Sequence, residues 1–484
     1  MVADLLDDVA VAEVRGDTAT TVVSSVEFDS RRAVAGALFC CVPGEHTDGH
    51  AHAADAVARG ATSLLCEHFC DLGVTQVRVA PGGARPAMAS VAAAFWGHPA
   101  RALDTVGVTG TNGKTTVTQL VRSVLEADGR PTGVVGTLGG ARTTPEAPDL
   151  QRTLAGMVSD GSRAVAMEVS SHALIQHRLD GIVFDVAVFT NLSRDHLDYH
   201  GTMEAYFEAK ASLFTPQRCR HAVVVADDAW GALLLERLRP LESAHFAVTA
   251  VRADEASDVE LAVGSTRFTW RGRPVVLPLS GRFNVENALV AAAVGRALGV
   301  DGDRVAEGLS SAPPVPGRME LVGAGAPVAV LVDYAHTPAG LSVALDAARS
   351  LAGPGRVLCV FGCGGDRDAG KRSQMGTVAT AGADEVVLTS DNPRSEDPLA
   401  IIDAIRAGAV EGAVVMVEPD RSAAIVLAVG RARPGDVVLV AGKGHEVTQT
   451  TGRGTVPFDD RVEAAHALAG RFGPVAGPPG EPLP

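Results

Sequence analysis

The chain has 484 residues, and its 42 basic and 57 acidic side chains give a formal net charge of −15. At about 150 residues per domain, this length predicts about three domains. Hydrophobic residues make up 46% of the chain, which argues against disorder, and the acidic balance argues against general affinity for nucleic acid. It leaves an anionic substrate open, because local basic groups can override the global charge.

The cysteines and the first residues of the chain indicate the cellular compartment of the protein. Seven cysteines, an odd number in a long chain without a disulfide framework, are typical of a reducing cytoplasm. The chain begins MVADLLDDVAVAEV, with adjacent acidic residues and no basic segment, so a signal peptide is not predicted. No uninterrupted apolar run approaches the ~20 residues that span a bilayer, so no membrane insertion is expected.

One cysteine pair invites a metal interpretation. Cys66 and Cys70 flank His68, but no second Cys/His pair stands at zinc-finger spacing. Small buried hydrophobic side chains are therefore the favoured interpretation of these cysteines.

Residues 1–97 alternate short apolar segments with Ala-rich ones. The predicted strands are 37–42 and 62–67, and the predicted helices are 52–60 and 86–97. His98-Pro99 follows as a linker, because proline disfavours helix in the residue before it. We expect an α/β domain over 1–97.

A fresh α/β pattern starts near Asp104. The predicted strands are 105–110, 163–169 and 184–190, and the predicted helices are Lys114 to Ala127 and 284–299. The Pro-rich stretch SAPPVPGR (311–318) marks the next boundary. We expect a central domain over 98–312 with a mostly parallel sheet.

The last part of the chain, 313–484, alternates strands and helices regularly. Strands are predicted near 328–333, 356–361, 385–389, 413–418 and 436–441. This alternation predicts parallel strands with right-handed crossovers, and hence a Rossmann-like domain. The Pro/Gly-rich tail, 473–484, is expected to be disordered.

The sharpest local signal is VTGTNGKTT (108–116), which follows a predicted strand and opens a predicted helix. Glycines let the backbone turn and present N–H groups to phosphate, and the helix N-terminus adds partial positive charge. Lys114 can reach the β/γ-phosphates, and the Thr115 hydroxyl can ligate Mg²⁺. Val108 stands where the general P-loop pattern has glycine, so the loop is a variant. The residues assigned to it are Gly110, Thr111, Asn112, Gly113, Lys114, Thr115 and Thr116.

Further segments show in which protein family this variant loop occurs. They are MEVSSHALIQHR (167–178), TNLSRDHLDYHG (190–201), YFEAKASLF (206–214), GRFNVENALVA (281–291), VPGRME (315–320), VDYAHTP (332–338), GCGGDRDAGKR (362–372), DNPRSEDP (391–398) and AGKGHE (441–446). With TGTNGKTT, the set resembles the Mur ligase family across nearly the whole chain. It is most similar to the MurE type, which adds the third residue of the peptidoglycan stem peptide.

The resemblance implies an ATP-dependent amide ligase. ATP would phosphorylate the γ-carboxylate of the D-glutamyl residue in UDP-MurNAc-L-Ala-D-Glu, and an amine of diaminopimelate would attack the acyl-phosphate. Such a site gathers several anionic groups, so cations must stabilise the reaction. Glu168 and His196 are implied as ligands of Mg²⁺, and Lys210 as a carbamylated lysine that binds a second Mg²⁺. Taken alone, Glu168 and Lys210 would be solvated side chains.

Further residues are implied for the nucleotide. Asn284 and Asn287 would lie near adenine, although Asn284 could equally be a helix cap. Arg318 and Asp333 would meet the nucleotide when domains close, the arginine as a phosphate partner and the aspartate at the ribose or hinge.

The N-terminal domain would hold the UDP end of the precursor. The residues implied for the precursor are Phe28, Ser30, Glu45, His46, Thr47, Thr143, Thr144, Ser170, Gln176 and Arg178. The family usually has Asn before the Thr-Thr pair, whereas this chain has Arg142, a departure that could tune substrate choice.

Diaminopimelate carries a carboxylate that lysine lacks, and Arg394 of DNPR offers a planar fork for it. In the family, the Arg version of this motif accompanies diaminopimelate, and Glu446 would hold the distal ammonium. The residues implied for the amino acid are Arg367, Asp391, Asn392, Pro393, Arg394, Gly442 and Glu446. The sequence does not distinguish meso- from LL-diaminopimelate.

Three other functions compete with this interpretation. A folylpolyglutamate synthetase is disfavoured by the N-terminal domain and by DNPR. A related ligase of a secondary-metabolite pathway stays open, because Arg142 and the EHT loop (45–47) depart from the pattern. A non-catalytic nucleotide-binding regulator would require loss of the chemistry-bearing residues Lys114, Glu168, His196 or Lys210, and all four are present. Family precedent suggests a monomer.

Overall fold

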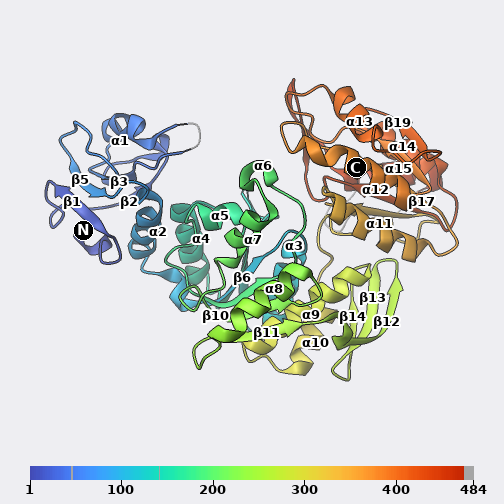
Figure 1. Cartoon of the computed structure of the whole chain (residues 1–484), viewed down its shortest axis with the longest axis horizontal. Helices are drawn as coiled ribbons and strands as arrows, with labels where there is room; N and C mark the ends of the chain where they lie inside the picture. Colours follow the sequence, from blue (N-terminus) through green and yellow to red (C-terminus); the bar gives the residue numbers. More distant parts are fainter. Residues whose placement is uncertain (45–46, 141, 474–484) are drawn as a thin grey trace.

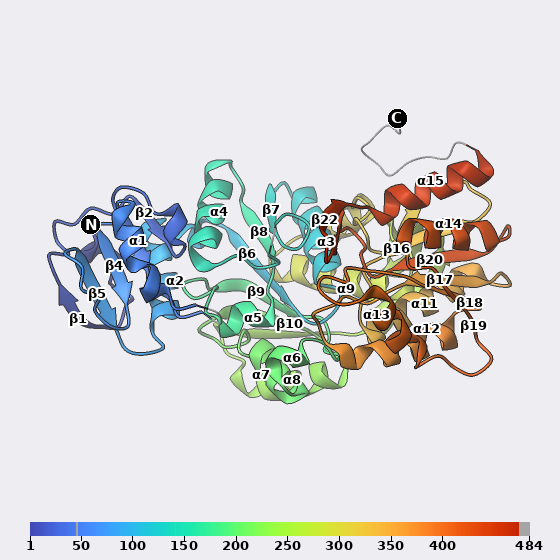
Figure 2. The same ribbon diagram turned by 90° about the horizontal axis from the view of Figure 1, so that it is seen from above.

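The structure is a computed structural model that describes residues 1–44, 47–140 and 142–473. Three lobes follow one another along the chain, coloured blue, cyan to yellow and gold to red in Figure 1, and Figure 2 shows them from above. Most of the tail predicted to be disordered lies outside the described residues. Within them, no helix has both the length and the apolar character needed to cross a bilayer.

The first lobe is built on a five-stranded sheet of order β1-β5-β4-β3-β2. Its strands are β1 (Val11–Arg15), β2 (Ser25–Glu27), β3 (Ala37–Cys40), β4 (Ser63–Cys66) and β5 (Thr75–Val79), and its helices are α1 (Ala53–Ala58) and α2 (Ala84–Phe95). β2 to β5 pair in parallel, whereas β1 joins the edge antiparallel to β5. Leu38, Leu65 and Val77 pack from this sheet against α2.

The second lobe contains a six-stranded sheet of order β11-β10-β9-β6-β8-β7 in which every pairing is parallel. Its strands are β6 (Asp104–Thr109), β7 (Thr132–Val135), β8 (Ala164–Glu168), β9 (Phe184–Phe189), β10 (Cys219–Val225) and β11 (Ala247–Val251). Its helices are α3 (Lys114–Ala127), α4 (Ala147–Ser159), α5 (Ser171–Ile175), α6 (Leu197–His200), α7 (Met203–Ala211) and α8 (Ala229–Leu238). Separate apolar clusters cover its two faces, because both faces of a parallel sheet are buried.

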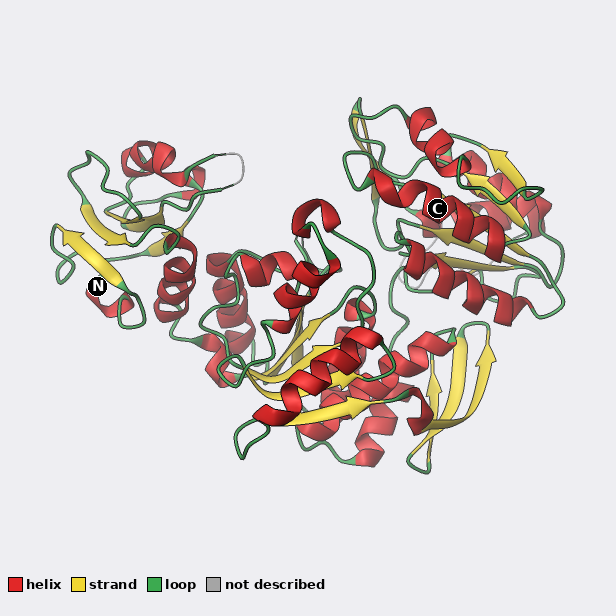
Figure 3. Cartoon of the chain, in the orientation of Figure 1, coloured by secondary structure: helices red, strands yellow, loops and turns green. Residues whose placement is uncertain are grey.

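A small antiparallel sheet extends this lobe at the lower right of Figure 3. It comprises β12 (Ala256–Ala262), β13 (Ser265–Trp270) and β14 (Arg273–Leu277), and two helices follow it, α9 (Arg282–Ala297) and α10 (Gly302–Ser310). Trp270 and Leu277 join the apolar cluster that also contains α3 and α9.

The third lobe carries a six-stranded sheet of order β15-β16-β20-β17-β18-β19. Its strands are β15 (Glu320–Val322), β16 (Ala329–Asp333), β17 (Val357–Phe361), β18 (Glu385–Leu388), β19 (Val414–Val417) and β20 (Val437–Ala441), followed by a hairpin of β21 (Thr448–Thr451) and β22 (Gly454–Pro457). Its helices are α11 (Pro338–Ala352), α12 (Arg372–Gly382), α13 (Pro398–Arg406), α14 (Arg421–Arg431) and α15 (Asp460–Phe472). Within the six-stranded sheet, all pairings are parallel except that of β15 with β16.

The expected fold class, α/β with a mostly parallel central sheet and a Rossmann-like last lobe, is confirmed. Several elements were not predicted, among them β7, β10, β11, α4, α8 and the β21–β22 hairpin. The antiparallel sheet β12–β14 was missed, and β15 departs from the expected parallel pattern because it is an edge strand that turns back beside β16.

Candidate active site

The glycine-rich loop joins the end of β6 to the start of α3. Gly110 has φ +143° and Gly113 has φ +86°, conformations that side chains rarely adopt. A Cβ at Gly110 would lie 1.9 Å from Thr190 Oγ1, and one at Gly113 would lie 2.6 Å from Asn287 Oδ1. Only glycine fits at these two positions, so the loop keeps the tight turn that phosphate binding needs.

The segment after β9 fixes the loop from the other side. Asn191 accepts the Thr111 N–H on its carbonyl (2.9 Å) and the Asn112 N–H on Oδ1 (3.0 Å). Thr190 Oγ1 donates to the Asn112 carbonyl at 2.6 Å, and Asn112 Nδ2 donates to Ser193 Oγ at 3.3 Å. Sequence reasoning took only His196 from TNLSRDHLDYHG and missed these supporting residues, although the same motif contains them.

Two lysines meet at one backbone carbonyl of the loop. Lys114 Nζ donates to Gly110 O (3.0 Å) and to Thr111 O (2.8 Å), and Lys210 Nζ donates to Gly110 O at 2.8 Å. Burial, reinforced by the Lys114 charge, lowers the pKa of Lys210 well below its usual range. Burial also lowers the pKa of Lys114. Lys210, at the end of α7, is therefore not the solvated helical lysine of the simplest interpretation.

Glu168, at the end of β8, faces the first turn of α3. Its Oε1 accepts from Thr115 Oγ1 (3.0 Å) and from the Thr137 N–H (2.9 Å), and its Oε2 accepts from Thr137 Oγ1 (3.1 Å). Thr116, next in the turn, is buried. Thr115 and Glu168 thus present two hard oxygen ligands side by side, a donor set that suits Mg²⁺.

His196 lies apart from this pair, on the turn that opens α6. Its Nε2 is 3.4 Å from Asp195 Oδ2, and its ring is 5.0 Å from that of His172. Desolvation by neighbouring groups lowers the pKa of His196 to about 4 although 47% of the side chain is exposed, and the neutral imidazole is available as a ligand at neutral pH. Across 1–44, 47–140 and 142–473, no three His, Cys, Asp or Glu side chains lie together in a way that could hold a metal ion. Cys66, His68 and Cys70 do not form such a group either.

The residues assigned to the nucleotide fall into two groups. Asn287 borders Gly113, and its Nδ2 donates to Asn284 Oδ1 at 3.0 Å. Asn284 Nδ2 donates to Ser280 O at 2.8 Å, so this buried side chain braces the start of α9 and does not cap it. On the other side, Arg318 from the third lobe donates from Nη2 to Thr115 Oγ1 at 3.0 Å.

Asp333 is buried at the end of β16. It accepts the Met319 N–H on Oδ2 (2.7 Å) and the Ala335 N–H on Oδ1 (2.8 Å). Its contacts therefore shape the connection that carries Arg318.

Residues assigned to the precursor come from both the first and the second lobe. Thr143 Oγ1 is 3.2 Å from Thr137 Oγ1, and Thr144 Oγ1 donates to Glu168 O at 2.8 Å. The remaining members are Ser170, which caps α5, Gln176, Arg178, and, in the first lobe, half-buried Phe28, Ser30 and exposed Thr47. Glu45 and His46 lie outside the described residues.

Residues assigned to diaminopimelate gather at the carboxyl ends of β18 and β20. Asn392 Nδ2 donates to Glu446 Oε2 at 2.8 Å, and Lys443 Nζ bonds both side chains, at 3.2 Å to Asn392 Oδ1 and 3.0 Å to Glu446 Oε2. Gly442 has φ +116°, and a Cβ there would lie 2.7 Å from Asp391 Oδ2. Sequence reasoning missed Lys443, although AGKGHE contains it.

The arginines of this region differ in their surroundings. Arg394 has φ +52° and its Nη1 donates to Gly365 O at 2.7 Å, while its N–H bonds Thr450 O in the β21–β22 hairpin. Pro393 is buried beside it, and Arg367 is exposed. The carboxyl end of a parallel sheet is the usual ligand edge of such folds.

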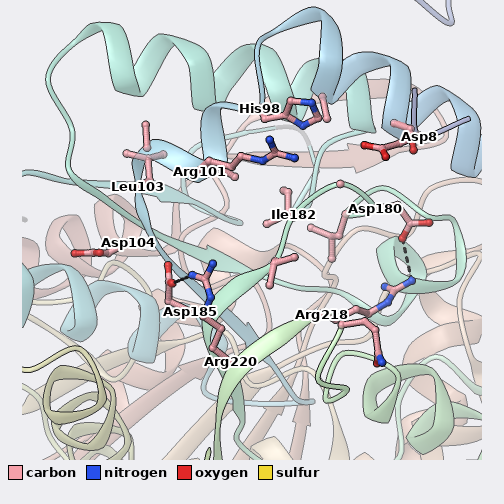
Figure 4. A pocket seen from close by; sticks show the side chains of 18 of the residues that line it. Asp8, His98, Arg101, Leu103, Asp104, Asp180, Ile182, Asp185, Arg218 and Arg220 are labelled. Carbon is pink, nitrogen blue, oxygen red and sulfur yellow. Dashed lines mark hydrogen bonds and ion pairs between the residues drawn. The ribbon is translucent and has the colours of Figure 1, made fainter. Parts of the chain in front are cut away.

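A separate cavity of about 910 Å³ lies between the first and second lobes, at the amino edge of the central sheet. Figure 4 shows Arg101, Asp180 and Arg218 on its wall, with Arg218 Nη2 paired to Asp180 Oδ1 at 2.9 Å. The phosphate loop leaves the opposite, carboxyl edge of β6, so this cavity is not the candidate active site.

The fold and the site define a P-loop α/β protein whose last lobe reaches its nucleotide loop through Arg318. Family models match in three segments, the Mur ligase family catalytic domain over 22–104, the Mur ligase middle domain over 108–295 and the Mur ligase glutamate ligase domain over 317–444. The chain belongs to the Mur ligase family.

Individual relatives support the same grouping. The chain is 44% identical to the UDP-N-acetylmuramoyl-L-alanyl-D-glutamate–2,6-diaminopimelate ligase of Gloeobacter violaceus, over 93% of this chain and 94% of that protein. It is 40% identical to the ligase of the same name from Listeria monocytogenes, over 96% and 98%. A solved structure under that name has 32% identity and a TM-score of 0.64, covering 93% of this chain and 95% of its own.

Proposed function

We propose that this protein is an ATP-dependent amide ligase that adds 2,6-diaminopimelate to the D-Glu γ-carboxylate of UDP-MurNAc-L-Ala-D-Glu, in peptidoglycan synthesis. The observation that carries the proposal is the bond from Arg318 to Thr115, because it joins the phosphate loop to the lobe that holds the amino-acid residues. Relatives that carry this activity in their names, at 40–44% identity, support it.

The reaction would proceed through carboxylate activation. The γ-carboxylate attacks the γ-phosphorus of ATP, ADP leaves, and an acyl-phosphate forms. An amine of diaminopimelate then attacks the acyl carbon, and the tetrahedral intermediate collapses to the amide and inorganic phosphate. Catalysis of such transfers depends on positioning and charge stabilisation.

The cations of this chain supply that stabilisation. Lys114 contacts the carbonyl of Thr111 and Arg318 contacts the hydroxyl of Thr115, and both side chains would hold phosphate oxygens. Thr115 and Glu168 would hold Mg²⁺, with His196 as a further ligand once substrates assemble the site. When bound, the ion would neutralise charge on the phosphates.

Lys210 is proposed to be carbamylated. Its neutral amine would attack CO₂, forming an N–C bond and releasing one proton, so that a buried amine becomes a carboxylate-like ligand for a second Mg²⁺. Complete burial and the depressed pKa support this, because only the unprotonated amine is nucleophilic.

Substrate selection would be divided between the lobes. Phe28, Ser30 and residues 45–47 would hold the UDP end, and the set from Thr143 to Arg178 the muramyl dipeptide. Arg394 would bind the distal carboxylate of diaminopimelate, and Glu446 its ammonium group. Arg367, Asp391, Asn392, Pro393 and Gly442 would complete that site.

The division into domains at 1–97, 98–312 and 313–484 is proposed on the separation of the apolar clusters. The central clusters run from Ala100 to Val315, and those of the last lobe begin at Met319. A monomer in the cytoplasm is proposed, and the seven free cysteines are compatible with a reducing compartment.

The decisive experiment offers meso-diaminopimelate, LL-diaminopimelate and lysine in parallel, with ATP and UDP-MurNAc-L-Ala-D-Glu. We expect phosphate release and a product mass one diaminopimelate residue larger. Faster addition of lysine would overturn the amino-acid assignment. Nucleotide binding without turnover would point to a regulator, and turnover only with another acceptor to a secondary-metabolite ligase.

Arg394→Ala tests the amino-acid site separately. Loss of a charge-assisted bidentate contact should raise the KM for diaminopimelate by roughly one to two orders of magnitude, while the KM for ATP stays unchanged. Equal losses for diaminopimelate and lysine would contradict the role of Arg394 in distinguishing them.

A further inference from the structure

Three guanidinium groups converge on one buried carboxylate where the first lobe meets the second. Glu146 Oε1 lies 2.7 Å from Arg142 Nη1 and 2.8 Å from Arg178 Nη2, and its Oε2 lies 3.4 Å from Arg85 Nη1. The Glu146 side chain is only 7% exposed. One carboxylate balances one of three positive charges, so this cluster holds a local surplus of two in a protein whose net charge is −15.

The neighbouring acidic side chains do not neutralise this positive charge, because they pair with other arginines. Asp149 pairs with Arg32 at 2.9 Å and with Arg152 at 3.2 Å, and Glu27 lies 3.4 Å from Arg32 and 3.6 Å from Arg152. These two acids and two arginines balance one another. The positive surplus therefore belongs to the cluster on Glu146.

Arg178 also has unused hydrogen-bonding capacity. Its Nη1 donates to Thr144 O at 2.8 Å and its Nη2 to Gln176 Oε1 at 2.6 Å. Its Nε is buried and has no hydrogen-bond partner among the described residues. A buried donor without a partner is costly and marks a place where a ligand can bind.

The cluster lies between the two groups of residues assigned to the precursor. Arg85 stands in the first turn of α2, and Ala84 beside it belongs to the apolar cluster against which Phe28 packs. Glu146 directly precedes α4, which packs against α2, and Thr144 lies two residues earlier. A molecule that reaches from Phe28 to Thr144 therefore passes these arginines.

We propose that Arg85 and Arg142, together with Arg178, form an oxyanion subsite for the UDP-MurNAc-dipeptide, and that Glu146 holds the three guanidinium groups in place. The inference rests on the proposed function. The shared chemistry is an oxyanion, supplied either by the diphosphate or by the α-carboxylate of D-Glu, and guanidinium groups bind both bidentately. At position 142, an asparagine could not supply this charge.

The test compares Arg142→Asn and Arg85→Gln with a matched control, Arg122→Gln. Arg122 forms the same kind of i,i+4 pair, at 2.8 Å with Glu126, but on an exposed face of α3. We expect each test variant to raise the precursor KM about tenfold, the size of one charge-assisted contact, with kcat and the other KM values within about twofold. The precursor KM of wild type should also depend more steeply on salt than that of Arg142→Asn.

Two substrate analogues identify the oxyanion. One carries an α-carboxamide on D-Glu, and the other is the 1-phospho-MurNAc-dipeptide, which lacks the diphosphate. With the analogue that lacks the contacted group, Arg142→Asn and wild type should have the same KM. An unchanged precursor KM in both variants, or an equal penalty with both analogues, would overturn the subsite.

Failure of the proposed function is distinguishable in the same experiment. It would show as absence of ligation by the wild type. Calorimetric titration with the precursor would then test the arginines independently, because binding needs no turnover. Loss of affinity in Arg142→Asn, with the melting temperature unchanged, would support the subsite, and unchanged affinity would refute it.

Discussion

Two lysine side chains of the candidate site are buried, one in the second lobe and one in the third. Lys210 shares the Gly110 carbonyl with Lys114, and two ammonium groups on one acceptor repel each other. Lys443 lies in the third lobe, where a carboxylate and an amide oxygen receive its charge. The surroundings of Lys210 thus favour its neutral form, whereas Lys443 is paired with a carboxylate at 3.0 Å.

Lys210→Ala should lose at least about a hundredfold in kcat if the carbamate is a metal ligand. Lys210→Arg should be equally inactive, because guanidinium keeps the positive charge but does not form the carbamate. Addition of a short-chain carboxylic acid should restore part of the activity to Lys210→Ala only. Full activity of that variant, measured by phosphate release with and without added bicarbonate, would contradict the modification.

Lys443→Met should raise the KM for diaminopimelate roughly tenfold, because Glu446 and Asn392 lose the group that fixes their orientation. The KM values for ATP and precursor should not change, which separates positioning from general damage to the fold. The measurement is a full set of steady-state constants beside the melting temperature. A fall in kcat alone, with the KM for diaminopimelate unchanged, would contradict the positioning role.

At the scale of elements, periodicity predicted β6, β8, β9, α3 and α9 of the second lobe, but not β7, β10, β11 or α4. The helix over Lys114 to Ala127 has the predicted bounds, and the strand predicted over 184–190 is β9 (Phe184–Phe189). The antiparallel sheet β12–β14 was missed because β12 is largely exposed and carries little apolar signal. β15 has only three residues, and its direction depends on a partner distant in sequence, which local patterns do not encode.

The candidate site shows the same division. Motifs predicted which residues would lie near the phosphate loop, such as Glu168 and Lys210. They did not predict that Thr137 would hold the Glu168 carboxylate or that Asn191 would hold the phosphate loop. Such contacts join segments that follow different strands. Supporting residues of this kind follow from tertiary packing, not from spacing along the chain.

Helix α14 offers an element-scale test through a buried ion pair. Arg421 and Asp460 side chains are 0% exposed and 2.7 Å apart, and Arg421 also donates to Ala441 O (2.9 Å) and Ser390 O (3.3 Å). Those carbonyls precede Gly442 and Asp391, so the pair positions both loops of the amino-acid site.

Asp460→Asn should destabilise the protein by about 3–5 kcal/mol, because it leaves a buried guanidinium without its counter-charge. It should also raise the KM for diaminopimelate in the enzyme that still folds. Asp459→Asn is the control, since Asp459 pairs at 2.6 Å with Arg461 in a less buried position and should cost about 1 kcal/mol. Chemical denaturation compares the two, and equal losses would contradict the role of the buried pair.

At the scale of the whole molecule, contacts between the second and third lobes involve polar groups. Arg194 Nε is 3.6 Å from Asp368 Oδ2, and Asp195 Oδ2 is 3.9 Å from His336 Nε2. Together with the bond from Arg318 to Thr115, these contacts join lobes that each have their own apolar core. Phe283 of the second lobe also packs against the apolar cluster of the third, so both polar and apolar contacts hold these two lobes together.

The same region predicts a dependence of stability on pH through His445. The His445 ring lies 5.1 Å from that of Tyr334, and burial, with the Arg318 charge, lowers the pKa of His445 to about 4. An unfolded histidine has a pKa of about 6.5. Between these values the unfolded chain binds the proton and the folded chain does not, so the contribution of His445 to stability falls as the pH drops from about 6.5 to about 4.

His445→Asn removes this proton uptake, so its melting temperature should fall less steeply than that of wild type over this range. At pH 7 and above, where neither state of the wild type is protonated at His445, the difference between the two proteins should be constant. All other titratable groups are the same in both proteins. The difference between their curves of melting temperature against pH therefore reports on His445 alone. Parallel curves between pH 6.5 and 4.5, measured by scanning calorimetry, would show that the folded and unfolded chains bind this proton alike, and would contradict the contribution of His445.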